Sequence, residues 1–216
     1  AKATQLVGTE IVLDLPSVGA TENIMLAAVF AEGQTTLSNA AQEPEIIDLA
    51  NFLNTLGADI HGAGTSEIII NGVNRNRLHG SEYTVMPDRI EAATYLMAAV
   101  GAGGQVVVEN CIPSHLHGVT HKLAEMGVTV DLIEPNSLRI SRPDPSIRLL
   151  PTNVITLPYP GFPTDLQAPM MSLLSVAEGT SILTESIYEN RFKQIGELKR
   201  MGAQIQVEGN AAIITG

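Results

Sequence analysis

The sequence AEGQTTL at residues 31–37 recurs as AGGQVVV at 102–108 and as AEGTSIL at 177–183. Each of these segments follows an apolar stretch of helical period and opens a stretch rich in β-forming residues. Further along each copy come LGADI, MGVTV and MGAQI. The glycines of the two motifs are 24, 23 and 23 positions apart in the three copies. Matching chemistry at matching spacing indicates an internal repeat.

Each copy is predicted to run strand, helix, strand, helix, strand, strand. For the first copy we expect strands at 10–15 and 35–40, helices at 20–31 and 43–57, and a hairpin of 59–64 with 66–72. Gly57 follows the second helix as its C-terminal residue. The second copy is expected from about 83 to 141 and the third from about 154 to 216.

The first helix of each copy is apolar nearly all round. The three segments are ENIMLAAVFA (22–31), EAATYLMAAVGA (91–102) and LQAPMMSLLSVA (166–177). Such helices must be buried on most sides. We therefore predict an α+β fold with helices packed inside a shell of sheets, rather than an open doubly wound sheet. On the repeats alone, residues 1–216 form a single lobe of three copies.

Composition excludes several classes of protein. The chain is 44% apolar and 16% charged, which is typical of a globular protein. A net charge of -11 repels nucleic acid, although local amides and arginines can still hold a small phosphorylated ligand. The longest apolar run, IMLAAVFA, is too short to span a membrane, and the amino terminus does not have the pattern of a signal peptide. Cys111 is the only cysteine, so we expect a cytoplasmic protein without an intrachain disulfide.

Five segments resemble the enolpyruvyl transferase family: PSVGATENIMLAA (16–28), QEPEIID (42–48), MPDRIEAATYLMAA (86–99), PGFPTDLQAP (160–169) and ENRFKQIGELKRMGA (189–203). The resemblance covers essentially the whole chain. It implies enzymes of about twice this length, with two lobes of three repeat units each, built as inside-out α/β barrels around an active-site cleft. Residues 1–86 would then be the last unit of one lobe, and residues 87–216 two units of the other.

The resemblance also implies an activity. Enzymes of this kind transfer the enolpyruvyl group of phosphoenolpyruvate to the 3'-hydroxyl of UDP-N-acetylglucosamine, the first committed step of peptidoglycan synthesis. They release phosphate through a tetrahedral intermediate and need no metal or organic cofactor. The chain looks like the middle of such an enzyme, without the cysteine loop, the amino-terminal Lys-Asn pair and the carboxy-terminal Arg that grip phosphoenolpyruvate. We expect it to be inactive alone.

Two rival interpretations remain. The first is the sister transferase that acts on shikimate 3-phosphate, which should carry a basic, Ser-rich acceptor loop that LPSVGATEN (15–23) lacks. The second is a non-catalytic binding domain made of three repeats.

The stretch LPSVGAT opens the first apolar helix. Its residue types are those of a helix cap, with a serine after a proline and then a glycine. Free N–H groups at a helix start also bind phosphate. The resemblance matches this stretch to the family's nucleotide-sugar loop. Some members carry a lysine at the position of the leucine, so only backbone contacts are expected from the first two residues. The matched residues are Leu15, Pro16, Ser17, Val18 and Gly19.

Asp165 is a single acid between prolines, where the third apolar helix begins. Thr164 and Gln167 form a T-x-x-Q capping box, which would leave Asp165 at the first helical position with a free carboxylate. The helix dipole favours the anion there. The resemblance matches Asp165 to the base that accepts the 3'-hydroxyl proton, and Thr164 to a substrate contact. A carboxylate of this kind contributes mainly through geometry.

Arg191 is predicted to stand at the start of the third copy's second helix. A cation there is slightly unfavourable, which favours a functional role over a solvated surface position. The resemblance places Arg191 toward the anionic substrates, where a guanidinium pairs with carboxylate or phosphate. It also matches Ile187 and Tyr188 to contacts around the nucleotide sugar, whereas their residue types alone suggest loop packing.

Three further features are interpreted as structural. Asp88 and Glu91 form a D-x-x-E capping box. Cys111 ends the strand QVVVENC with no arginine nearby, so it is predicted to be a small buried hydrophobe. In SHLHGVTH only His117 and His121 share a helix face and no acid completes a site, so no metal is expected.

Overall fold

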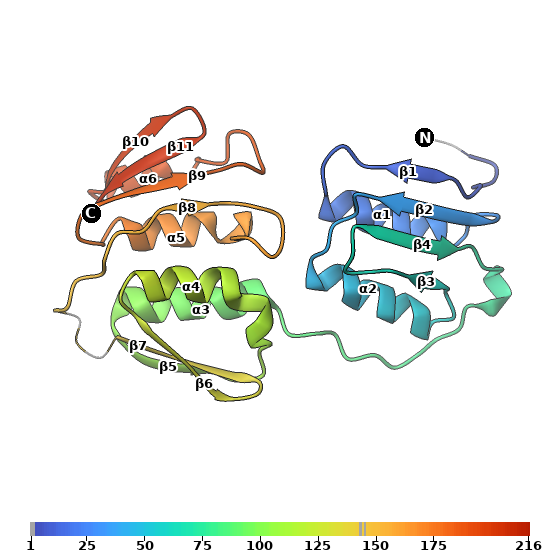
Figure 1. The fold of residues 1–216 in the computed structure, drawn as a ribbon, viewed down its shortest axis with the longest axis horizontal. Helices are drawn as coiled ribbons and strands as arrows, with labels where there is room; N and C mark the ends of the chain where they lie inside the picture. Colours follow the sequence, from blue (N-terminus) through green and yellow to red (C-terminus); the bar gives the residue numbers. More distant parts are fainter. Residues whose placement is uncertain (1–2, 143, 145) are drawn as a thin grey trace. The chain divides into compact units, whose positions relative to one another are not determined.

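The chain folds into two compact units in the computed structural model, which describes residues 3–142, 144 and 146–216 (Figure 1). Unit 1 is Ala1–Met86 and unit 2 is Pro87–Gly216. Each unit has its own cluster of buried apolar side chains.

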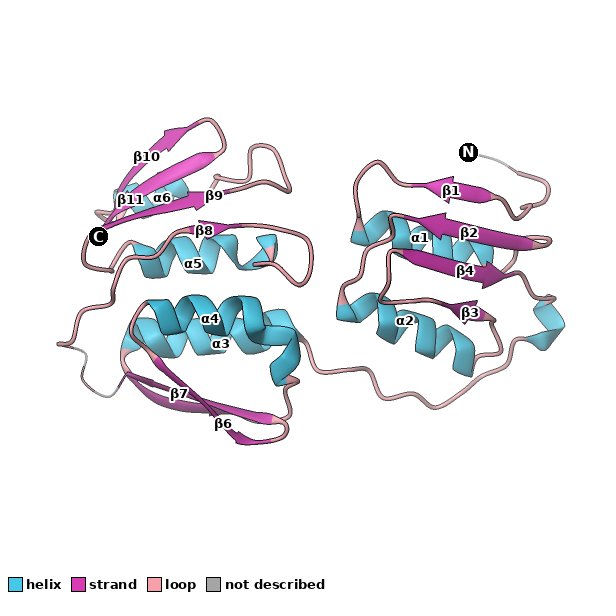
Figure 2. Ribbon diagram, viewed as in Figure 1, coloured by secondary structure: helices cyan, strands magenta, loops and turns pink. Residues whose placement is uncertain are grey.

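Unit 1 contains one copy of the repeat. Its elements are β1 (Glu10–Val12), α1 (Val18–Ala28), β2 (Gln34–Ser38), α2 (Pro44–Thr55), β3 (Ile60–His61), β4 (Glu67–Asn71) and the short 3₁₀ helix η1 (Arg75–Arg77). The sheet order is β1-β2-β4-β3, in which β1 runs parallel to β2 and the other pairs are antiparallel (Figure 2). The expected element order and hairpin are confirmed, and Gly57 ends α2 with a φ of 101°.

Unit 2 contains the second and third copies. The second consists of α3 (Arg89–Ala102), β5 (Gly104–Val108), η2 (Pro113–Leu116), α4 (His117–Glu125), β6 (Thr129–Glu134) and β7 (Ser137–Arg142). The third consists of β8 (Val154–Ile155), η3 (Thr164–Leu166), α5 (Gln167–Leu174), β9 (Thr180–Thr184), α6 (Ile195–Arg200), β10 (Gln204–Glu208) and β11 (Ala211–Thr215). Their sheets have the orders β5-β7-β6 and β10-β11-β9-β8, with β8 parallel to β9.

The second copy lacks the first strand that the sequence predicts, and that prediction is wrong. The segment expected to form the strand belongs to unit 1, where Tyr83 Oη and Met86 N donate to Asp48 Oδ1 at 2.8 and 3.3 Å. Among the described residues, β5 therefore has no parallel neighbour on its outer edge. Val106 of β5 is 38% exposed, whereas its repeat equivalent Thr35 is 3% exposed.

The apolar helices α3 and α5 pack against each other in unit 2 and share one core with both sheets. In Figure 1, α3, α4 and α5 lie between the two sheets of the unit, which confirms an α+β fold with buried helices. The first apolar segment of unit 1 is less covered than predicted. Leu26 of α1 is 48% exposed, and Phe30, in the turn after α1, is 46% exposed. Unit 1 holds only one copy, so it has no second apolar helix to cover that face. Within the described ranges, no helix is both long enough and apolar enough to cross a bilayer.

Asp88 caps α3, as the sequence predicts. Its Oδ1 accepts from the backbone N–H groups of Ile90 and Glu91 at 2.8 and 3.1 Å. These two donors have no acceptor within the helix, so the carboxylate satisfies groups that would otherwise depend on water.

We predict that Asp88→Ala lowers the free energy of unfolding by about 1 kcal/mol, because the two N–H groups lose their acceptor. Asp88→Asn is the matched control, since its amide oxygen can still accept, and it should stay close to the wild type. Urea denaturation of the three proteins measures the difference. Equal losses in both variants would contradict a capping role.

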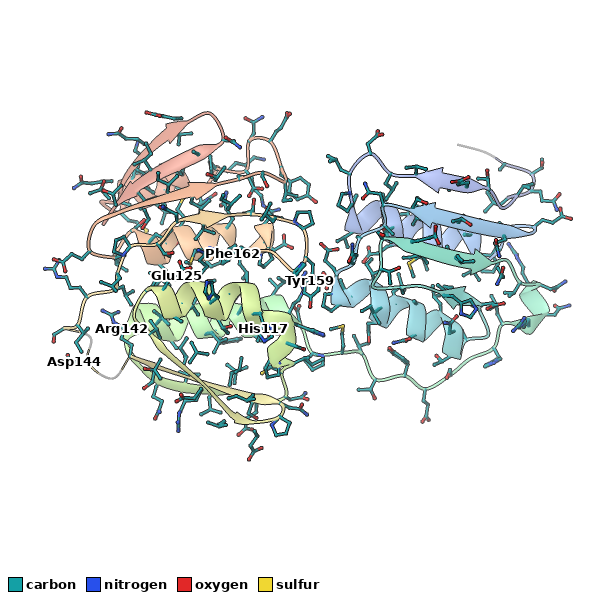
Figure 3. All side chains as sticks on the ribbon, in the orientation of Figure 1. His117, Glu125, Arg142, Asp144, Tyr159 and Phe162 are labelled. Carbon is teal, nitrogen blue, oxygen red and sulfur yellow. The ribbon has the colours of Figure 1, made fainter. Side chains whose placement is uncertain are left out.

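Glu125, at the end of α4, joins this helix to the loop that leads into β8 (Figure 3). Its carboxylate accepts from Lys122 Nζ at 2.9 and 3.0 Å and from the Thr152 hydroxyl, and it lies 3.1 Å from His121 Nε2. The hydrogen bond from Lys122, followed by that from Thr152, lowers the pKa of Glu125 below its ordinary value of 4.5, against the opposing effect of burial. The ionised form therefore stabilises the folded state.

We predict that Glu125→Gln removes a pH-dependent part of the stability. Because the folded-state pKa is lowered, the stabilisation is present above the ordinary value of 4.5 and is lost as the pH falls through the folded-state pKa. The difference in unfolding free energy between wild type and variant should thus be largest at neutral pH and should shrink on acidification. Denaturation between pH 3 and 7 measures it, with the exposed Glu134→Gln as control. A difference that grows on acidification would contradict the assignment.

Candidate functional site

The predicted site residues fall in both units. The loop before α1 belongs to unit 1, whereas Thr164, Asp165, Ile187, Tyr188 and Arg191 belong to unit 2.

The loop before α1 is fixed at the end of β1. Leu13 N donates to Ser38 O at 3.1 Å, and Asn39 Nδ2 donates back to Leu13 O at 2.8 Å. Asn39 has a φ of 56°, a left-handed conformation that asparagine tolerates better than most residues. The chain is thus anchored to both strands of the parallel pair just before it turns into the helix.

Ser17 is the N-cap of α1, as predicted, and its Oγ accepts from Ala20 N at 3.3 Å. Leu15, two residues earlier, is 74% exposed. Gly19 lies in open space, where an added Cβ would meet no atom within 4 Å, so nothing within unit 1 requires a glycine there. The first N–H groups of a helix lack intrahelical acceptors. The loop therefore presents backbone donors and a helix start that an anionic group can use.

Asp165 and Arg191 form an ion pair in unit 2, although they are far apart in the sequence. Arg191 Nη2 lies 2.7 Å from Asp165 Oδ1, and the side chains of Arg191 and Asp165 are 34% and 56% exposed. The guanidinium carbon also lies 5.0 Å from the centre of the Tyr188 ring, within the range of a cation–π contact. Three of the predicted residues therefore form one partly exposed cluster.

The predicted capping box of Thr164 and Gln167 is wrong. Thr164 opens the 3₁₀ helix η3, and its hydroxyl donates to Glu185 Oε2 at 2.9 Å instead of capping the helix. Gln167 is buried; it donates to Arg191 O at 3.4 Å and accepts from Gln194 Nε2 at 2.7 Å. Both side chains take hydrogen-bond partners from the loop after β9 instead of capping the helix. Asp165 lies in the 3₁₀ helix η3, which precedes α5.

Arg191 does not start the second helix of the third copy, so that prediction is wrong. Helix α6 begins at Ile195, and Arg191 lies in the loop before it. The unfavourable interaction with a helix dipole therefore does not apply. Its place is set by Gln167, which holds the Arg191 carbonyl, and by Asn190, whose φ of 57° turns the chain just before it.

Glu185 is the site residue that sequence reasoning missed. It is 4% exposed, and its carboxylate accepts hydrogen bonds from Thr156, Thr164 and two backbone N–H groups. The alternation of β9 contains a signal that could have found it. Ser181 and Leu183 are both fully buried, and Glu185 is the next residue of that series. An acid on the inward face of a strand is unusual enough to indicate a role.

The cluster has clear chemical capacities. A partly exposed carboxylate can accept a proton from a hydroxyl group that is brought within hydrogen-bonding distance. A guanidinium can pair with a phosphate or carboxylate group. In unit 2 these two functions come from η3 and from the loop between β9 and α6.

Cys111 is buried, as its structural interpretation predicts, whereas the histidine segment differs from expectation in having an acid beside one histidine. Cys111 is 2% exposed, its Sγ donates to Val108 O at 3.6 Å, and burial raises the pKa of its thiol. His121 lies beside Glu125. In the part of the chain that the structure describes, no three or more His, Cys, Asp or Glu side chains are grouped so that they could hold a metal ion.

A separate open pocket of about 250 Å³ lies on unit 1, between α2 and the segment before Met86. It is lined by Glu45, Asp48, Leu49, Phe52, Tyr83 and Val85. None of the predicted site residues lines it, and Asp48 is already bonded to Tyr83. The pocket is therefore not part of the candidate site.

Comparison with known proteins identifies similar sequences along the whole chain. The family described as EPSP synthase (3-phosphoshikimate 1-carboxyvinyltransferase) matches residues 1–216. The chain is 54% identical over 216 residues to UDP-N-acetylglucosamine 1-carboxyvinyltransferase 1 of Caldanaerobacter subterraneus, and 53% identical over 215 residues to UDP-N-acetylglucosamine 1-carboxyvinyltransferase 2 of Bacillus subtilis. It covers 51% and 49% of those proteins, so the chain spans about half the length of the curated relatives it matches.

Solved structures share the fold. The enolpyruvyl transferase NikO from Streptomyces tendae superimposes with a TM-score of 0.87 over 99% of this chain and 52% of its own, at 26% identity. EPSP synthase from Acinetobacter baumannii gives a TM-score of 0.66 over 98% of this chain and 49% of its own, also at 26% identity.

We predict that the Asp165–Arg191 pair contributes less than about 1 kcal/mol to stability, because partly exposed ion pairs are screened by water. A double-mutant cycle of Asp165→Asn and Arg191→Gln, followed by urea denaturation, measures the coupling energy. The exposed Glu197–Arg200 pair provides the matched control cycle. A coupling well above that of the control, at about 3 kcal/mol, would mean that the pair serves mainly to hold the fold together.

Proposed function

The chain belongs to the EPSP synthase family of enolpyruvyl transferases, and from this membership we propose that it is part of an enzyme acting on UDP-N-acetylglucosamine. The reaction is transfer of the enolpyruvyl group of phosphoenolpyruvate to the 3'-hydroxyl of the sugar, with release of phosphate. The names of the relatives that are 54% and 53% identical support this acceptor over shikimate 3-phosphate. The geometry that carries the proposal is the meeting of Asp165 and Arg191 at 2.7 Å.

Asp165 is proposed as the base. Its carboxylate is 56% exposed, so an acceptor hydroxyl can reach it without rearrangement of the core. Arg191 holds one of its oxygens, and the other can take the proton as the hydroxyl oxygen forms its bond to carbon. Arg191 also supplies a positive charge beside the phosphate and carboxylate groups of the substrates.

The remaining predicted residues are proposed to bind the nucleotide sugar. Ser17 serves as a cap, so its contribution and those of its neighbours in the 15–19 loop come from the backbone, with N–H donors from every residue except Pro16. Ile187 and Tyr188 belong to a turn whose N–H groups are held by Glu185, which leaves their side chains to make the contacts. Tyr188 is 58% exposed and offers an aromatic face.

The two units are proposed to belong to different lobes. Unit 1 would be the last repeat of one lobe, and unit 2 would be two repeats of the other. Because the chain spans about half the length of its relatives, the groups that grip phosphoenolpyruvate would lie elsewhere in the protein. The same proposal implies that the enzyme acts in the cytoplasm. It also implies that the enzyme catalyses the first committed step of cell-wall synthesis and so contributes to cell growth and division.

We predict that Asp165→Asn in the full-length protein lowers kcat by about 100-fold or more, because an amide cannot accept the hydroxyl proton. Binding of UDP-N-acetylglucosamine, measured by calorimetry, and the melting temperature should change little. The assay follows phosphate release from phosphoenolpyruvate with the nucleotide sugar.

Three controls separate the alternatives. The isolated 216-residue chain should show no turnover, since the proposed phosphoenolpyruvate site lies outside it. Shikimate 3-phosphate in place of the nucleotide sugar should give no phosphate release. Binding of the nucleotide sugar with no turnover by the wild-type full-length protein would instead identify a binding domain, and a large loss of stability with kcat intact would make Asp165 structural.

A further inference from the structure

The third copy differs from the first at the end of its second strand. In unit 1, Asn39 follows β2 and its amide donates to Leu13 O, which ties β2 to the strand beside it. The registers of the two sheets place Glu185 at the equivalent position after β9, opposite Thr156. Thr156 Oγ1 donates to Glu185 Oε1 at 2.8 Å. A hydrogen bond therefore joins the two strands in both copies, but the residue after the second strand donates in the first copy and accepts in the third. The third copy thus has a carboxylate where the first has an amide.

This carboxylate binds more than the neighbouring strand. Its Oε1 also accepts from the backbone N–H groups of Ile187 and Tyr188 at 2.8 and 3.1 Å. Its Oε2 accepts from the Thr164 hydroxyl at 2.9 Å. A buried anion is costly unless hydrogen bonds compensate it, and here four donors from three segments do so. Only the bond from Thr156 joins the two strands. The other three bonds have no part in joining them and therefore indicate a further role.

The bonds of Glu185 reach a residue next to Asp165 and a residue in contact with Arg191. Thr164 precedes Asp165 in η3, so the bond to Oε2 fixes the backbone that carries the proposed base. On the other side, the N–H groups held by Oε1 fix the turn that carries Tyr188, whose ring lies under the Arg191 guanidinium. Glu185 itself is 4% exposed, which excludes direct contact with a substrate.

We propose that Glu185 is a positioning residue that sets the geometry of Asp165 and Arg191 from beneath the site. The proposal rests on the proposed function, because that function makes Asp165 the base and Arg191 the residue that pairs with anionic substrate groups. The length of the glutamate side chain is essential to this role. It allows one buried carboxylate to accept hydrogen bonds from η3, from the end of β8 and from the loop after β9. Shortening the side chain by one methylene keeps the charge but withdraws the carboxylate from some of these donors.

The test uses the full-length protein with Glu185→Asp. We expect kcat to fall by about 10- to 100-fold, because displacements of the order of 1 Å at catalytic groups have effects of this size. Glu185→Gln keeps the length and one accepting oxygen, and the Thr164 hydroxyl can rotate to accept from the new amide, so its loss should be smaller than that of Glu185→Asp. Asn210→Ala is the matched control. It removes the bond from Asn210 Nδ2 to the Glu185 backbone carbonyl and leaves the carboxylate network intact, so its kcat should stay within about twofold of the wild type.

A second readout does not depend on turnover. The guanidinium resonances of Arg191, assigned in the NMR spectrum by their absence from Arg191→Lys, should shift in Glu185→Asp and remain in place in Asn210→Ala. Unchanged Arg191 resonances, or an unchanged kcat in folded Glu185→Asp, would overturn the positioning role. If the wild-type protein shows no transferase activity, the proposed function fails by itself, and the Arg191 resonances alone decide whether Glu185 sets the geometry of the pair.

Discussion

The packing of α3 against α5 is the constraint on which unit 2 depends. Both helices are apolar nearly all round, and Leu96, Met97, Met170 and Met171 are each no more than 3% exposed. Burial of such side chains contributes roughly 1.5–3 kcal/mol each. Since η3 runs directly into α5 and also contacts α3, this packing determines where Asp165 lies. The base is thus positioned at the start of a buried helix.

The repeated units keep one core plan and differ where their strands end. The parallel pairs β1–β2 and β8–β9 have the same register, and in both a polar side chain joins the two strands beyond their last residues. In the third copy that side chain is Glu185, and its hydrogen bonds extend to the Asp165–Arg191 cluster. A scaffold whose buried positions repeat can therefore acquire a site by changes confined to loops and strand ends. Arg191 lies in such a loop, and Asp165 lies in the short 3₁₀ helix η3 that precedes α5.

Local features of the chain were predictable where the interacting residues are close in sequence. The caps at Ser17 and Asp88 use donors three residues away or fewer, and both formed as expected. The box of Thr164 and Gln167 has equally good spacing and did not form, because Glu185 and Gln194 offered better partners from another segment. Serine, threonine and similar side chains can hydrogen-bond to nearby or to distant groups, and sequence spacing alone does not predict which of the two forms.

The sequence by itself determined the repeat, the α+β class and the burial of the apolar helices of unit 2, because periodicity is a property of neighbouring residues. The family followed from the resemblance of five segments to its members. Only the tertiary structure decided that the segment before Pro87 pairs with α2 of unit 1 instead of forming a strand beside β5. It likewise decided that Asp165 meets Arg191 above a buried Glu185. The physical reason is that these contacts join segments about 20 to 35 residues apart, whose meeting depends on how the helices pack and not on any local preference.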